Sequence, residues 1–155
     1  MSINKKEKPY FIREIREGDA EELFVFLDNL DGKTKSYFHP HSFDLETIID
    51  ICKSKKDHYF VMFIDDELIG YSFLRLFGFE IPSFGIIIKD EFTGKGYGTI
   101  LTRWTIDKAR ILGYKKVILK TYIENISARK VYENIGFKIT GETIDKKQFK
   151  MEIIL

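Results

Sequence analysis

Three glycines alternate with larger residues in the segment FTGKGYGT, which spans residues 92–99. Gly94, Gly96 and Gly98 let the main chain approach an anion closely, because glycine lacks a Cβ and tolerates positive φ. The helical pattern that follows begins with N–H groups that have no intrahelical partner and carry partial positive charge. The spacing predicts a phosphate-binding turn with Lys95 as an added cation, and a plain surface turn is the alternative.

Neither common nucleotide-binding motif fits this segment. A P-loop needs Gly-Lys-Ser/Thr after a first glycine and four intervening residues, and the segment lacks it. A dinucleotide-binding turn that starts at Gly94 needs a last glycine where Thr99 stands, and it normally lies in the opening β-α-β unit. A nucleotide-binding protein is therefore the weakest hypothesis.

Two histidines and one glutamate stand in apolar surroundings. His39 and His41 are separated by one proline, and such a pair suits proton relay, with structural hydrogen bonding as the alternative. No third ligand with suitable spacing accompanies them, so we expect no metal site. Glu80 lies between Phe79 and Ile81, a setting that suits a general base unless the loop is solvated.

Arg75 is a charged residue within an apolar, strand-like run. It either faces a cleft, where it would pair with a substrate carboxylate, or lies on the exposed face of its strand. Cys52 is the only cysteine, so no disulfide forms within the chain, and we expect a packed thiol there.

Length and charge restrict the class of protein. A chain of 155 residues favours one domain over residues 1–155, with the polar, lysine-rich residues 1–8 as a mobile tail. The 25 basic and 24 acidic residues nearly cancel, so no global field favours nucleic acid or an anionic membrane. No run of about 18 apolar residues occurs, and we expect a cytoplasmic protein.

The elements that position these residues follow from the apolar patterns. Strands are predicted at residues 10–17, 58–64, 68–80, 84–90, 115–122, 137–142 and 148–155. Helices are predicted at residues 18–30, 45–54, 100–112 and 125–135. The segment 31–43 is predicted to be a loop. A helix between the strands near Ile88 and Val117 implies a right-handed β-α-β crossover, and hence a parallel pair inside a mixed sheet.

These features together resemble the GNAT superfamily of acyl-CoA-dependent N-acyltransferases. The family's acetyl-CoA signature, Arg/Gln-x-x-Gly-x-Gly/Ala, is matched by TGKGYG at residues 93–98, with Thr93 in place of the usual Arg or Gln. The family's downstream pattern, Asn-x-x-Ala-x-x-x-Tyr-x-x-x-Gly-Phe, is matched by Asn125, Ala128, Tyr132, Gly136 and Phe137. The order of elements agrees across essentially the whole chain.

The resemblance implies an α/β fold with a mixed, mostly antiparallel sheet, a splayed parallel strand pair, and helices on both faces. The pantetheine arm of coenzyme A would pair with the main chain of one splayed strand, and the pyrophosphate would rest on N–H groups of the glycine turn. The cofactor-binding residues implied in this way are Ile86, Ile87, Ile88, Thr93, Gly94, Lys95, Gly96, Tyr97, Gly98, Thr99 and Asn125.

The resemblance also implies transfer of an acetyl group from acetyl-CoA to a primary amine by direct attack. Tyr132 would protonate the departing thiolate, because a phenol with a pKa of about 10 is protonated at neutral pH. The family often places its base early on the fourth strand, where Pro82 and Phe84 cannot serve. The base is then Glu80, a histidine of the loop, or water.

The acceptor is a small-molecule or peptide amine that the sequence does not identify. The residues expected on the acceptor side are Phe38, His39, His41 and Arg75. Since a fold does not dictate a function, a non-catalytic acyl-CoA-binding or sensing module on the same fold is the second hypothesis. A homodimer paired through the strands from Phe137 onward is one assembly that the sequence allows.

Overall fold

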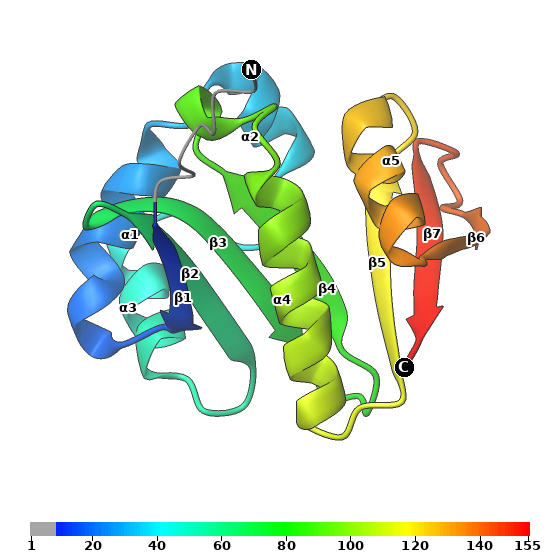
Figure 1. Ribbon diagram of the computed structural model, residues 1–155, viewed down its shortest axis with the longest axis horizontal. Coiled ribbons are helices and arrows are strands. Elements are labelled where there is room, and N and C mark those ends of the chain that lie inside the picture. Colours follow the sequence, from blue (N-terminus) through cyan, green and yellow to red (C-terminus); the bar gives the residue numbers. More distant parts are fainter. Residues whose placement is uncertain (1–8) are drawn as a thin grey trace, which may run out of the picture.

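The computed structural model describes residues 9–155, which form one seven-stranded sheet with helices on both faces (Figure 1). The strands are β1 (Tyr10–Glu14), β2 (His58–Ile64), β3 (Glu67–Arg75), β4 (Ser83–Ile88), β5 (Lys116–Tyr122), β6 (Lys138–Glu142) and β7 (Gln148–Ile154). The helices are α1 (Ala20–Asp28), α2 (Gly32–Tyr37), α3 (Leu45–Lys53), α4 (Tyr97–Ile111) and α5 (Ile126–Ile135), with short 3-10 turns η1 (Glu17–Asp19) and η2 (Asp90–Phe92). The tail expected at residues 1–8 lies outside the described residues.

The sheet has the strand order β1-β2-β3-β4-β5-β7-β6. Every neighbouring pair is antiparallel except β4 and β5, which are parallel and joined through α4. This confirms the expected α/β fold with a mixed, mostly antiparallel sheet that contains one parallel pair. Within residues 9–155, no helix is long and apolar enough to cross a membrane.

The two faces of the sheet bury separate sets of side chains. Strand β2 is buried along almost its whole length, because its alternate residues point to opposite faces and both faces are covered. Tyr59, Val61 and Phe63 pack with α1 and α3, whereas Phe60 packs with α4 and α5 on the other face. In Figure 1, α4 and α5 lie in front of the sheet, and α1 and α3 lie behind it.

Helix α2 corrects the prediction of a loop over residues 31–43. Asp31 caps this short helix, since its Oδ1 accepts a hydrogen bond from the Thr34 N–H at 2.7 Å. The Thr34 hydroxyl and the Asp31 N–H in turn donate to the carboxylate of Asp90, at 2.8 and 3.0 Å. Six residues that begin with glycine are too few for an apolar repeat, so the pattern of the sequence did not reveal this helix. Asp90 therefore holds α2 next to the turn that leads into α4.

Candidate active site

The glycine turn follows β4 and the short turn η2, and it leads into α4. Gly94 has φ +74° and Gly96, the N-cap of α4, has φ +91°, so both occupy a region in which other residues are strained. Ile100 is the first residue whose N–H is paired along the helix, with the Gly96 carbonyl at 3.1 Å. No acceptor within residues 9–155 pairs with the N–H groups of residues 94–99. The turn therefore offers a row of free donors at the positive end of a helix.

Strands β4 and β5 diverge over the part of β4 that leads to this turn. They share one aligned pair, Ser83 opposite Ile118, where the Ile118 N–H donates to the Pro82 carbonyl at 3.1 Å. Beyond it, β5 continues to pair with β7, so the edge of β4 at residues 86–88 has no partner strand on that side. Main-chain groups of β4 are thus available to a molecule that enters between the strands.

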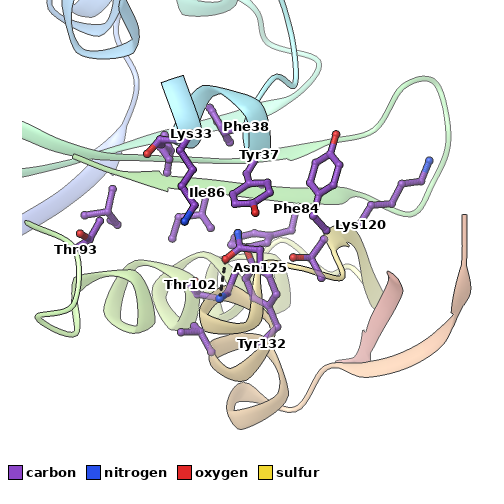
Figure 2. Close-up of a pocket in the computed structure, with 18 residues that line it drawn as sticks. Lys33, Tyr37, Phe38, Phe84, Ile86, Thr93, Thr102, Lys120, Asn125 and Tyr132 are labelled. Carbon is purple, nitrogen blue, oxygen red and sulfur yellow. Dashed lines mark hydrogen bonds between the residues drawn. The ribbon is translucent and has the colours of Figure 1, made fainter. Parts of the chain in front are cut away.

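A cavity of about 360 Å³, here called the gap cleft, occupies this fork (Figure 2). Its lining is Lys33, Thr34, Tyr37, Phe38, Phe84, Gly85, Ile86, Ile87, Ile88, Thr93, Thr102, Lys120, Thr121, Tyr122, Asn125, Ala128, Val131 and Tyr132. The predicted cofactor residues of β4, together with Thr93 and Asn125, are therefore brought together with Tyr132.

Tyr132 lies on α5 and its ring is buried against two phenylalanines. The ring centroids of Phe84 and Phe137 are each 6.0 Å away in edge-on arrangements. Burial raises the pKa of Tyr132, so the phenol stays protonated well above neutral pH. The hydroxyl has no hydrogen-bond partner within the described part of the chain, although the side chain lines the gap cleft. It is therefore free to donate its proton to a group in that cleft.

Asn125 and Lys33 face one another across the gap cleft. Asn125 caps α5, because its side-chain oxygen accepts from the Ala128 N–H at 3.4 Å. Lys33 reaches in from α2 on the opposite side, and Figure 2 shows its ammonium pointing toward Asn125 and the Thr93 end of the cleft. Lys95, the cation expected from the sequence, instead holds its ammonium 5.6 Å from the ring centre of Phe92, and it does not line the cleft.

A second cavity, here called the aromatic cleft, adjoins the first and has a volume of about 380 Å³. Its lining is Tyr37, Phe38, His39, Pro40, Phe73, Arg75, Phe77, Ser83, Phe84, Gly85, Lys120, Tyr122 and Gln148. Several of these residues also line the gap cleft, so the two spaces are continuous. Gly85 sits at the junction, where a Cβ would lie 2.1 Å from the ring of Phe73. Only glycine leaves room for that ring.

The two histidines have different environments. His39 lines the aromatic cleft, and its Nε2 lies 2.8 Å from the hydroxyl of Tyr122. His41 lines neither cleft; its Nδ1 lies 2.7 Å from the Ser42 carbonyl and its Nε2 3.0 Å from the Tyr71 hydroxyl. Since a carbonyl only accepts, Nδ1 carries the proton and Nε2 accepts from Tyr71. Burial lowers the pKa of His41, which favours this neutral, hydrogen-bonded form.

Arg75 lines the aromatic cleft, whereas Glu80 does not reach either cleft. The Arg75 Nη1 donates to the Pro40 carbonyl at 2.7 Å, and the guanidinium carbon lies 4.5 Å from the ring centre of Phe77. Glu80 is an exposed residue of the β3–β4 loop. The structure therefore brings Arg75, His39 and Phe38 together and leaves Glu80 and His41 outside.

The sequence did not point to several residues that line these clefts, among them Lys33, Lys120 and Tyr122. Lys33 lies on the helix that was not predicted. Lys120 and Tyr122 occupy alternate positions of β5, and the alternating pattern KVILKTY was the signal that places them on one face. Within residues 9–155, no three His, Cys, Asp or Glu side chains gather as metal ligands.

Comparisons with known proteins agree with this geometry. The profile of the acetyltransferase (GNAT) family matches residues 12–137. An N-acetylaspartate synthetase of Danio rerio is 38% identical over 58 residues, which cover 37% of this chain and 21% of the relative. Human N-acetyltransferase 8B is 35% identical over 80 residues, which cover 52% of this chain and 32% of the relative. The matched regions thus span about a fifth to a third of the length of these curated relatives.

Solved structures match over nearly the full chain. A ribosomal-protein-S5-alanine acetyltransferase from Vibrio fischeri superposes with a TM-score of 0.81 at 18% identity, covering 99% of this chain and 97% of its own. A spermidine N-acetyltransferase from Vibrio cholerae, in complex with CoA and spermine, gives a TM-score of 0.78 at 26% identity and covers 94% and 95% of the two chains. With the family match over residues 12–137 and the forked β4–β5 pair beside the glycine turn, this chain belongs to the acetyltransferase (GNAT) family.

Proposed function

We propose that this protein is an N-acetyltransferase that moves an acetyl group from acetyl-CoA to a primary amine by direct attack. The observation that carries the proposal is the row of unpaired N–H groups at residues 94–99. These residues do not line the gap cleft themselves, but Thr93 and Thr102 on either side of them do, together with Tyr132. Similarity to N-acetyltransferases, one of them in complex with CoA, supports the proposal.

The gap cleft would hold the cofactor. Its pyrophosphate would accept hydrogen bonds from the amides of residues 94–99. The ammonium of Lys33 would add a positive charge there, since Thr93 stands where the family usually has arginine or glutamine. The pantetheine arm would lie along the unpaired edge of β4 at residues 86–88, with Asn125 on the opposite side. This arrangement delivers the thioester to the junction of the two clefts near Gly85.

The reaction needs two proton transfers around one carbonyl carbon. A neutral amine attacks the carbonyl, the C–N bond forms, and the C–S bond breaks to release the thiolate of coenzyme A. A β4 amide would donate to the carbonyl oxygen as negative charge develops there. Tyr132 would then give its proton to the sulfur, since burial keeps the phenol protonated.

The proton lost by the amine would leave through water to His39. His39 lines the aromatic cleft beside Tyr122, whereas Glu80 lies outside both clefts. Replacing His39 with glutamine should lower kcat/KM at neutral pH and change its pH profile. If His39→Gln behaves like the wild type and Glu80→Gln loses activity, then Glu80 is the base.

Tyr132→Phe tests the reaction itself. With an acceptor that is turned over, release of free thiol should fall about 100-fold or more, the usual contribution of a general acid. The Kd for CoA, measured by calorimetry, should change little, because only one hydroxyl is removed. Tyr114→Phe is the matched control, since Tyr114 bonds His58 at 2.7 Å outside both clefts. Equal rates in Tyr132→Phe and the wild type would remove Tyr132 from the mechanism.

A non-catalytic acyl-CoA-binding module is distinguished by the same measurements. Such a protein would bind CoA through the amides of residues 94–99 but would release no thiol with any amine in a broad panel.

The cytoplasmic location and the homodimer stay predictions. Strand β6 lies at an edge of the sheet, where a strand of a second subunit could pair with it.

A further inference from the structure

We propose that the amine acceptor also carries an anionic group, a carboxylate or a phosphate, which binds Arg75 and Lys120 in the aromatic cleft. This inference rests on the proposed acetyl transfer and names the class of substrate for the same site. It excludes polyamines as preferred acceptors.

Arg75 and Lys120 project from the same face of the sheet. Arg75 pairs with Ser83 across β3 and β4, and Phe73 pairs with Gly85 two residues further along. Ser83 is also the residue aligned with Ile118 of β5, and Lys120 follows Ile118 by two residues, as Gly85 follows Ser83. Because side chains alternate along strands, these residues share the face that carries the aromatic cleft. Both cations line that cleft.

The lining of the aromatic cleft includes two cations and no carboxylate. Lys120 is exposed and makes no ion pair within the described residues. Its antiparallel neighbour is Lys150, which is also exposed and unpaired in the same part of the chain. Two like charges directly opposite one another on a sheet are unfavourable unless an anion lies nearby. Lys150 does not line the cleft, but its charge adds to that of Lys120 next to it.

Arg75 is only partly neutralised by the protein. Asp57 is its nearest carboxylate, with Oδ2 4.0 Å from the Arg75 Nε, and this acid does not line the cleft. The Nε itself is buried without a hydrogen-bond partner. On the opposite side, Glu124 accepts a long hydrogen bond of 3.4 Å from the Tyr37 hydroxyl and also lies outside the lining. Neither acid occupies the space between Arg75 and Lys120.

The positions of the two cations also indicate the shape of the acceptor. Arg75 is aligned with Ser83, two residues from Gly85 at the junction of the clefts, which corresponds to about 7 Å along the strand direction. The walls between them are aromatic. The rings that line the cleft are Tyr37, Phe38, Phe73, Phe77, Phe84 and Tyr122. An amine joined to its anionic group through an apolar or aromatic spacer fits this space, whereas a polyamine would bring further positive charge next to two cations.

Matched acceptors test the preference for an anion. We suggest para-(aminomethyl)benzoate, para-(aminomethyl)phenyl phosphate, the neutral para-(aminomethyl)benzamide, and spermidine, each with acetyl-CoA while free thiol is measured. The wild type should use at least one of the two anionic amines with a kcat/KM about tenfold above that of the benzamide, and spermidine least well. This preference should decline with added salt, because Lys120 is exposed.

Variants test whether the cations of the aromatic cleft cause the preference for anionic amines. Lys120→Gln should reduce the anion-to-amide ratio severalfold, and Arg75→Lys should retain more of it than Arg75→Met. Lys138→Gln is the matched control, because Lys138 is an exposed strand lysine that lines neither cleft. A preference that is unchanged in both Lys120→Gln and Arg75→Met would overturn the assignment, provided that thermal melts show these variants to be folded. If Arg75→Met does not fold, Lys120→Gln alone decides.

A binding measurement separates this inference from the proposed reaction. The N-acetylated forms of para-(aminomethyl)benzoate and para-(aminomethyl)benzamide are titrated by calorimetry into protein saturated with CoA. This measurement requires no turnover. Tighter binding of the benzoate without thiol release from any amine would support the anion site and contradict acetyl transfer. Thiol release with equal or better use of the benzamide and spermidine would support acetyl transfer and overturn the anion site.

Discussion

Replacing Gly96 with alanine should weaken the binding of coenzyme A while leaving the protein folded. Gly96 is the N-cap of α4 and has φ +91°, a conformation that costs an L-residue about 1–2 kcal/mol. No heavy atom lies within 4 Å of the Cβ that alanine would add, so the penalty is conformational and not steric. For a chain of this length, about 1 kcal/mol lowers Tm by roughly 2–4 °C.

The effect on binding should exceed the effect on stability. If the turn relaxes toward negative φ to relieve the strain, the N–H groups next to Gly96 rotate away from the position of the pyrophosphate. A hydrogen bond to a charged group contributes about 1.5–3 kcal/mol. Since about 1.4 kcal/mol is a factor of ten, the loss of one such bond should raise the Kd for CoA roughly 10- to 100-fold.

Gly113→Ala supplies the control at the other end of the same helix. Gly113 has φ +88°, and the space around its hypothetical Cβ is equally empty, but it follows the last turn of α4 and lines neither cleft. Both variants should therefore lose similar stability, as measured by thermal melts, and calorimetry should show weaker CoA binding only for Gly96→Ala. Equal Kd values for Gly96→Ala and the wild type would refute the assignment of the pyrophosphate to these amides. So would an equal loss of affinity in Gly113→Ala.

Three further predictions concern the clefts and the buried phenol. Lys33→Gln should raise the Kd for CoA about two- to fivefold at low salt, as expected for one exposed ionic contact, and Lys138→Gln should not; calorimetry at two salt concentrations checks this. Gly85→Ala should displace the ring of Phe73, lower stability by about 1–3 kcal/mol in urea melts, and raise KM for the acceptor, with partial rescue by Phe73→Leu. Because burial raises the pKa of Tyr132, its contribution to stability should be complete below about pH 10 and decline as the pH rises above that value. In thermal melts from about pH 8 to about pH 11, the stability of Tyr132→Phe should decline less steeply with pH than that of the wild type.

Local patterns predicted most of the fold. The β2–β3 hairpin follows from two apolar runs that meet at Asp65 and Asp66, both of which have positive φ in the structure. Helix α4 ends just before Gly113, as the sequence indicated, but it begins at Tyr97, inside the glycine turn and before the predicted start at residue 100. Such signals are readable because a turn, a cap or an apolar repeat depends on residues that are close in the sequence.

Fewer of the residues that form the site could be predicted from the sequence. Tyr132 and Asn125 were identified by resemblance to a family pattern, and the structure places both beside β4. Glu80 was chosen for its apolar neighbours, yet Phe79 and Ile81 are exposed, so the loop does not enclose its carboxylate. His39 and His41 looked alike in the sequence, and only their distances to Tyr122 and Tyr71 separate them.

By itself, the sequence determined that this chain has the α/β fold of the acetyltransferase (GNAT) family, with a glycine turn at the start of a helix. It could do so because those features are encoded within single segments and their order. The tertiary structure alone decided which side chains line the two clefts, since β4 and β5 diverge after one aligned pair and α2 is held over the gap by Asp90. Contacts of this kind join residues that are dozens of positions apart, and their geometry depends on how the whole sheet is assembled.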